Sequence, residues 1–301
     1  MKIRLDNKNG ERTTFTPRQS VINNIVGSYT ERITQEYIST EIVPKLKKSY
    51  EYVKLYGPNV RIFTQDSITA LKIIKLVYPA SWVLPPECER VYIKKTTDEI
   101  GNWKIVDTAC KQGNIFEIVS TDYEAEALKD LIEDLISNSC FVTKRSKEGL
   151  LRFYKILKES RYAPDFIIIA LDVVGEKSIN VSSQLKELQI RTTFQLPVVE
   201  VKKLIVIETK STNPPARVEF STSQKKFFEL FSDQDIAEFL LIYIPINNVI
   251  PLKNIPLVLY HFSPGETINV KAFRQYRNKQ RKNTWILNKY LIGQDKTTKQ
   301  Q

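Results

Sequence analysis

Two apolar runs with acidic residues at their ends constrain this chain more than any other feature of its sequence. Pro164-Asp165 opens the run Phe166 to Leu171, and Glu208-Thr209-Lys210 closes the run Leu204 to Ile207. If the two runs are neighbouring antiparallel strands, the start of the first lies beside the end of the second. We therefore expect the two acids to meet at one edge of a sheet.

The spacing also predicts the chemistry of that edge. Side chains alternate across a strand, so Glu208 and Lys210 share one face while Thr209 points to the other. Two carboxylates are hard oxygen donors that suit Mg²⁺, with Mn²⁺ as a substitute, and a neighbouring lysine can orient water or stabilise the charge on an attacked phosphate. The pattern indicates hydrolysis of phosphodiester bonds.

These residues resemble the PD-(D/E)xK nuclease superfamily over roughly residues 146–244. Phe220 to Phe228 looks like the helix that follows the third motif strand in VRR-type members, and Ala237 to Ile244 supplies their next strand. The resemblance implies an α/β (α+β) fold of the restriction-endonuclease type, with a mixed sheet flanked by helices.

The resemblance also implies roles for individual residues. Asp165 and Glu208 would bind the metal with the backbone carbonyl of Thr209, and Lys210 would position or polarise the attacking water. Gln224 would orient water or phosphate. A local role is the alternative for Gln224, because residues 221–224 read as a capping box in which the glutamine satisfies a backbone amide. We expect the geometry to allow only one of these two roles at a time.

Superfamily members often carry a further acid on the helix before the first motif strand. Apolar residues at helical spacing predict this helix from Ser146 to about Ser160. Glu148 in its first turn is the candidate, in preference to Glu159 in its last turn. A structural role is the alternative, since an acid near Ser146 as N-cap faces the positive end of the helix dipole.

The acid-x-lysine tripeptide is weak by itself, because the chain contains it three times. The copy at residues 6–8 follows no apolar strand. Glu200, in the copy at residues 200–202, would lie near Asp172 at the opposite end of the same two strands, so this pair is the alternative site. The connection from Asp172 to Glu200 is longer than the family's hairpin, which means either an extended hairpin or a wrong strand pairing.

The composition favours a polyanionic partner. Lysine and arginine outnumber the acids by 45 to 34, giving a net charge of +11. No run approaches the roughly 18 apolar residues of a spanning helix, and the N-terminus lacks a signal peptide's apolar segment, so we expect an intracellular, cytoplasmic protein without membrane contact. Three isolated cysteines and a single histidine, His261, disfavour zinc ribbons, iron–sulfur clusters and histidine-based mechanisms.

The last part of the chain is basic and aromatic, and residues 267–294 contain no acid. Lysine and arginine neutralise phosphates, and interleaved aromatic side chains can stack on bases. The candidates for nucleic-acid contact are Lys271, Arg274, Arg277, Lys279, Arg281 and Lys282.

The length allows two domains and a tail. We expect a separate mixed α/β domain over residues 1–140, a nuclease core over 141–266 and a basic segment over 267–301. The first domain would include a helical stretch from about Arg18 to Tyr56, and DNA recognition, dimerisation and a structural role all fit it.

The sequence thus predicts a Mg²⁺-dependent deoxyribonuclease, an endonuclease of a restriction, mobile-element, viral or repair system. RNA would yield to the same chemistry, and a homodimer is compatible with the sequence. The alternative is a non-catalytic accessory protein that binds nucleic acid and keeps a vestigial nuclease fold.

Overall fold

The structure is a computed structural model, and it describes most of the chain between residues 17 and 268. The described residues are 3–6, 12–15, 17–61, 70–89, 91–97, 103–110, 130, 133–184, 189–212, 218–245, 254–268 and 283–286. The helices are α1 (Pro17–Tyr37), the π-helical turn η1 (Ile38–Ile42), α2 (Val43–Lys47), α3 (Ala70–Val77), α5 (Lys144–Ser160), α6 (Thr222–Leu230) and the 3-10 turn η2 (Phe231–Asp233).

Strands from both halves of the chain build one mixed sheet. The strands are β1 (Ile3–Asp6), β2 (Arg12–Phe15), β3 (Tyr52–Tyr56), β4 (Val83–Leu84), β5 (Val91–Thr97), β6 (Trp103–Cys110), β7 (Cys140–Val142), β8 (Phe166–Gln184), β9 (Gln189–Thr212), β10 (Ala237–Pro245), β11 (Asn254–Phe262) and β12 (Asn283–Ile286). Eight of them form the sheet, in the order β12-β11-β10-β9-β7-β4, with β8 on β9 and β3 on β8. The prediction of an α/β protein with a mixed sheet flanked by helices is confirmed.

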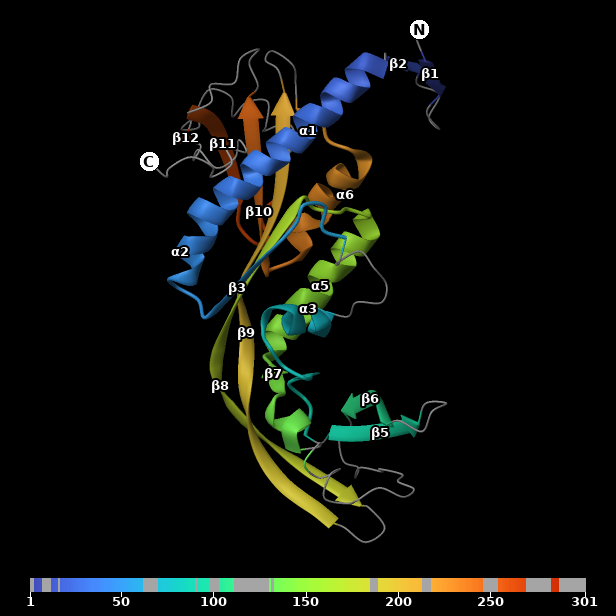
Figure 1. Cartoon of the computed structure of the whole chain (residues 1–301), viewed down its shortest axis with the longest axis vertical. Helices are drawn as coiled ribbons and strands as arrows, with labels where there is room; N and C mark the ends of the chain where they lie inside the picture. Colours follow the sequence, from blue (N-terminus) through green and yellow to red (C-terminus); the bar gives the residue numbers. More distant parts are fainter. Residues whose placement is uncertain are drawn as a thin grey trace, which may run out of the picture.

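Helices cover both faces of this sheet (Figure 1). On one face, apolar residues of α3, α5 and α6 pack against alternate residues of the strands, such as Ile167 and Val206. On the other face, Ile33 of α1 and Ile38 of η1 pack against the intervening residues, such as Ile207. A strand buried on both faces reads as a continuous apolar run, which explains the two runs of the sequence.

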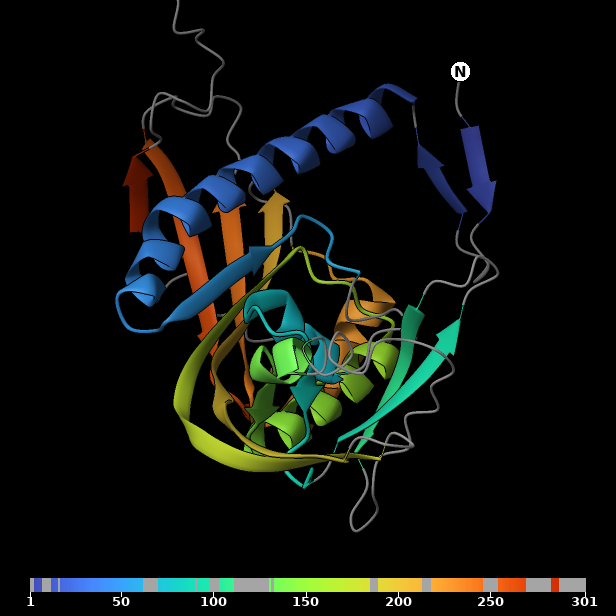
Figure 2. The same cartoon turned by 60° about the horizontal axis from the view of Figure 1, so that its bottom comes forward.

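The long connection between the two apolar runs is an extension of the strands themselves. β8 and β9 stay paired antiparallel from Phe166 opposite Ile207 to Gln184 opposite Gln189. The register shifts between Ala170 and Leu171 and again between Val173 and Gly175. Figure 2 shows the resulting ribbon curving past α3 and α5. The predicted pairing of the runs is therefore confirmed, and the long connection between them is an extended hairpin.

The first 140 residues contribute to the central sheet, and this corrects the expectation of a separate N-terminal domain. β3 pairs with β8, and β4 pairs with β7. The predicted helix from Arg18 to Tyr56 is also wrong in its second part, because helical structure ends at Lys47 and Tyr52–Tyr56 is β3. A short stretch rich in tyrosine, valine and leucine fits a half-buried strand as well as a helix, and pairing with β8 decides the outcome.

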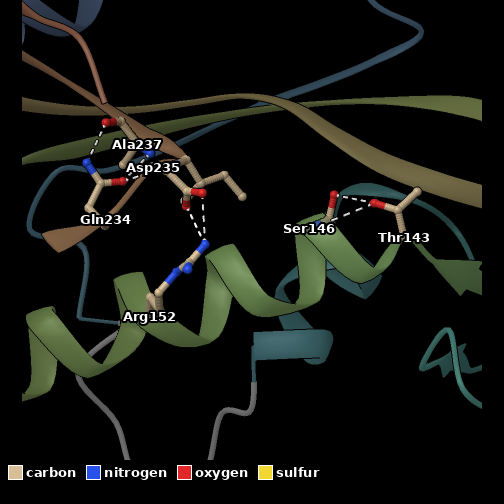
Figure 3. A network of polar contacts seen from close by, with 7 residues as sticks. Thr143, Ser146, Arg152, Gln234, Asp235 and Ala237 are labelled. Carbon is tan, nitrogen blue, oxygen red and sulfur yellow. Dashed lines mark hydrogen bonds and ion pairs between the residues drawn. The ribbon is translucent and has the colours of Figure 1, made fainter. Parts of the chain in front are cut away.

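Helix α5 is fixed to the sheet at several points (Figure 3). Its N-cap is Thr143 and not Ser146, because the Thr143 hydroxyl accepts the Ser146 N–H. The Ser146 hydroxyl is free to accept the N–H of Val201 on β9 at 2.9 Å. Further along, Arg152 forms two bonds to the Asp235 carboxylate, of 2.7 and 2.8 Å. These contacts hold the first half of α5 against β9 and the segment before β10.

Cys140 and Cys88 differ in their chemical state. Cys140 is a free, buried thiol, and burial raises its pKa to about 12. Cys88 is disulfide-bonded, a state that persists in oxidising compartments more than in the cytosol, so the expected intracellular location stays a prediction. None of the helices in the described ranges has the length and apolar character needed to cross a bilayer.

Candidate active site

The structure brings Asp165 and Glu208 together at the edge of the sheet. Phe166 pairs with Ile207 in the β8–β9 register, so the acids that flank this pair lie opposite each other. Both Phe166 and Ile207 face α1, and alternation therefore directs the two acids to the face that carries α5 and α6. The predicted convergence of the two carboxylates is observed.

Glu208 is held by three donors. Its side chain is only 3% exposed, and Lys210 Nζ lies 2.9 Å from Oε1. The Gln224 amide also donates to Oε1. The hydroxyl of Tyr162, itself fully buried, donates to Oε2 at 2.7 Å. The carboxylate is thus fixed in orientation by groups from β9, from α6 and from the segment after α5.

Asp165 is less buried and less neutralised. Its Oδ2 accepts the N–H of Thr209 at 2.7 Å. Burial, followed by the charge of Glu208, raises the pKa of Asp165 to about 7. Burial also raises the pKa of Glu208, and the contacts with Lys210, Tyr162 and Gln224 oppose that rise. Two carboxylates that resist ionisation side by side form a site that is short of positive charge.

Gln224 completes the predicted capping box and also contacts Glu208. Its side-chain oxygen accepts the N–H of Ser221 at 2.9 Å, and the Ser221 hydroxyl accepts the Gln224 N–H, which completes the capping box of α6. Its amide nitrogen meanwhile donates to Glu208. The two ends of a primary amide serve different partners, so the capping box does not keep Gln224 away from Glu208. Its role in orienting water or phosphate stays a prediction.

The acids line an open pocket of about 480 Å³, and several of its other residues had no signal in the sequence. Glu31 of α1 lines it, and its charge contributes to the raised pKa of Asp165. Asn59, after β3, and Arg161 and Tyr162, after α5, line it as well. Glu31 and Asn59 precede Asp165 by more than a hundred residues, so local spacing could not connect them with the site.

Glu148 does not join this cluster. It is exposed near the start of α5, where its carboxylate lies 4.0 Å from the ammonium of Lys144. The pocket meets the other end of this helix at Arg161, and thirteen residues at 1.5 Å rise place Glu148 about 20 Å away along the axis. Glu159 pairs with Lys226 at 3.6 Å and does not line the pocket either. The acid that lines the pocket from a helix is Glu31 of α1.

The alternative acids face each other as expected, at the other end of the apolar runs, and β8 and β9 continue beyond them to Gln184 and Gln189. Asp172 is opposite Glu200. The Asp172 carboxylate accepts the Glu51 N–H at 2.9 Å, and Glu200 forms an ion pair with Lys202. Leu171 and Val201 face α5 and α6, so the acids next to them project from the opposite face of the sheet. Asp172 thus fixes the start of β3, and Glu200 belongs to an ion pair near the surface.

The remaining predictions concern the metal and the basic tail. Within the described residues, no group of three or more histidine, cysteine, aspartate or glutamate side chains is arranged to hold a metal ion. The six basic candidates between Lys271 and Lys282 lie outside the described residues. His261 is on β11 at the surface, where Nε2 lies 2.9 Å from Glu238.

We compared the chain with models of known protein families, with curated proteins and with solved structures, and none of these comparisons gave a match. The interpretation of the site rests on its geometry and chemistry.

Proposed function

We propose that this protein is a metal-dependent nuclease that hydrolyses phosphodiester bonds of DNA, built on a restriction-endonuclease-like core. One observation carries the proposal. Asp165 and Glu208 lie opposite each other in an open pocket, and a lysine on the same face as Glu208 contacts it. Buried carboxylates with raised pKa values store electrostatic repulsion, and such groups are typical of functional sites.

The donor set fits Mg²⁺ or Mn²⁺. Within the described part of the chain, the second oxygen of Asp165 has no hydrogen-bond partner. The N–H of Thr209 points to Asp165, and its carbonyl is expected to point the same way, because both groups of a strand residue face one neighbour. A divalent ion there would polarise the phosphate and lower the pKa of a bound water. Water and substrate oxygens would complete the ligand shell, as Mg²⁺ commonly has them.

The other residues of the pocket act on the attacking water and on the ligands. Lys210 is close enough to Glu208 to hold a water beside the carboxylates or to donate to a phosphate oxygen. Tyr162 and Gln224 orient Glu208 through their bonds to its two oxygens and oppose the rise in its pKa. Glu31 supplies a third negative charge from α1, in the role that the sequence assigned to Glu148.

The net charge of +11 supports a nucleic-acid substrate through attraction to phosphates. Because the metal chemistry acts on the phosphodiester itself, RNA is tested beside DNA.

The experiment is a cleavage assay with supercoiled and linear DNA and with RNA, in Mg²⁺, in Mn²⁺ and in EDTA. We expect metal-dependent cleavage that falls at least a hundredfold in Asp165→Ala and in Lys210→Ala. Asp172→Ala and Lys202→Ala are the matched controls from the other end of the apolar runs, and we expect each to retain cleavage within about threefold.

Metal-dependent cleavage that survives both Asp165→Ala and Lys210→Ala would refute the assignment of the site. Salt-sensitive DNA binding without cleavage under any divalent metal would instead support the accessory-protein alternative.

A further inference from the structure

Two polar residues with a left-handed backbone lie on the pocket. In the described backbone, the non-glycine residues with positive φ are Asn59 at 59° and Arg161 at 53°. Both line the pocket that holds Asp165 and Glu208. Side chains other than glycine enter this region at a cost, and such residues gather where surrounding structure imposes them for a function.

Arg161 is held in place by the end of α5. It is the C-cap, with φ 53° and ψ 33°, and its N–H bonds to the carbonyls of Leu157 and Lys158. The next residue, Tyr162, donates its hydroxyl to Glu208. Glycine is the usual residue where a helix ends in the left-handed region. An arginine here places its side chain on the rim of the pocket, next in sequence to the residue that orients Glu208.

Asn59 is held by a second loop that is tied to the first. The N–H of Val60 donates to the carbonyl of Pro164 at 2.8 Å, directly before Asp165. Gly57, with φ 143°, approaches so closely that a Cβ would lie 2.2 Å from the Phe166 ring and 2.7 Å from the Asp165 carbonyl. The two loops therefore bracket Asp165 from both sides.

Arg161 is not used to neutralise the acids of the pocket. Its side chain is exposed, and it forms no ion pair with any described residue. Lys210 already serves Glu208. A guanidinium with an unoccupied fork, on a pocket with three acids, is suited to an anion that arrives with the substrate. The planar fork matches two oxygens of one phosphate.

We infer that Arg161, with Asn59 as a neutral second donor, binds the non-bridging oxygens of a phosphate in the nucleic-acid strand and so places the strand over Asp165 and Glu208. This inference rests on the proposed function, because the strand is the substrate of the same pocket. It adds a substrate-binding subsite formed by the 57–60 loop and the end of α5.

The test measures binding of fluorescently labelled duplex and single-stranded DNA to the full chain, in EDTA, over a series of salt concentrations. Arg161→Gly is expected to raise the Kd about tenfold and to lower the slope of log K against log salt by about one. Because glycine suits the left-handed C-cap, the melting temperature of Arg161→Gly should equal or exceed that of the wild type. Arg161→Lys keeps the charge and loses the fork, so its Kd should lie between those of the wild type and Arg161→Gly.

One further variant is a control and another tests the second donor. Arg145→Ala removes an exposed arginine from the other end of α5 and should leave the Kd and the salt slope unchanged. Asn59→Gly leaves the left-handed backbone conformation at position 59 accessible and removes the side-chain donor. It should weaken binding about threefold without changing the slope of log K against log salt, since no charge is lost.

Binding by Arg161→Gly that equals binding by Arg145→Ala would overturn the inference, even if the wild type cleaves DNA. Cleavage in Mg²⁺ is measured separately on the same proteins. A wild type that binds DNA through Arg161 and never cleaves would support the phosphate contact and refute the nuclease proposal. A wild type that neither binds nor cleaves nucleic acid would refute both.

Discussion

The two ends of the apolar stretch of the β8–β9 pair carry the same residue types in different surroundings. Asp165 faces Glu208 at one end, and Asp172 faces Glu200 at the other. Each glutamate is followed two residues later by a lysine that forms an ion pair with it. The side chain of Glu208 is 3% exposed, whereas that of Glu200 is 19% exposed.

The difference lies in what packing adds to the same pattern. At the first end, burial raises the pKa of both acids, while Tyr162 and Gln224 fix the orientation of Glu208. At the second end, the Asp172 carboxylate is occupied by a backbone N–H at the start of β3. An acid-x-lysine step therefore becomes a candidate for catalysis only where the fold removes water and supplies further donors.

The largest expected effect comes from making the same substitution at both ends and comparing the loss of cleavage. Glu208→Gln should lower metal-dependent cleavage by about 10³-fold, because Glu208, which would bind the metal and contacts Lys210, loses its charge. Glu200→Gln should change cleavage less than threefold. Initial rates at saturating Mg²⁺ measure both. Equal losses at the two ends would mean that burial does not distinguish the sites.

A stability measurement tests the charge of the first end without relying on activity. The pKa of Asp165 is about 7 in the folded protein, above its value in the unfolded chain. The contribution of the protonated carboxyl to the free energy of unfolding is therefore fully present below about pH 4 and is lost as the pH rises through 7. Asp165→Asn stays neutral and can still accept the Thr209 N–H. In EDTA at pH 8 it should be more stable than the wild type, by on the order of 2 kcal/mol after allowance for solvent screening.

This stability difference should shrink toward pH 4, as followed by urea unfolding across the pH range. Asp172→Asn, the matched change at the other end, should stay within about 0.5 kcal/mol of the wild type at pH 8. Added Mg²⁺ should stabilise the wild type more than Asp165→Asn. A gain in Asp165→Asn that does not vary with pH would contradict the raised pKa.

Removing one donor to Glu208 should have a smaller effect. Tyr162→Phe keeps the ring, whose centroid lies 4.5 Å from that of Phe227, and deletes the hydroxyl. The pKa of Glu208 should rise, because the Tyr162 bond lowers it. We expect cleavage to fall about tenfold at neutral pH, with the acid limb of the rate profile moving to higher pH.

Tyr50→Phe is the control for this change, because Tyr50 lines the pocket next to Asp172. It should leave both the rate and the pH profile unchanged. A loss of rate in Tyr162→Phe without a shift of the acid limb would argue against a role through Glu208.

The smallest expected effect concerns the irregularity in β9 that separates the two ends. The Ser146 hydroxyl accepts the N–H of Val201, next to the register shift. Ser146→Ala should cost about 1 kcal/mol, since a buried N–H loses its acceptor. Ser160→Ala removes another buried serine of α5, whose hydroxyl bonds to a carbonyl of the same helix, and should cost less. Unfolding curves and hydrogen exchange at Val201 measure the difference.

Several features of the site could be predicted from the sequence because they depend on local pattern. The apolar runs at Phe166 and Leu204 predict strands, and their antiparallel pairing predicts the meeting of Asp165 with Glu208. The capping box predicts the start of α6. Glu31, Asn59 and Tyr162 could not be found in this way, because they reach the pocket through packing and not through spacing.

The order of residues alone sets which side chains alternate along β8 and β9 and places acids at both ends of the apolar runs. Packing of the folded chain sets which pair of acids is buried. Asp165 and Asp172 are seven residues apart, whereas Glu200 and Glu208 are eight apart, and the register shift absorbs the extra residue. Since side chains alternate at every residue, the odd separation along β8 puts the two pairs on opposite faces, and only one face carries Tyr162 and Gln224.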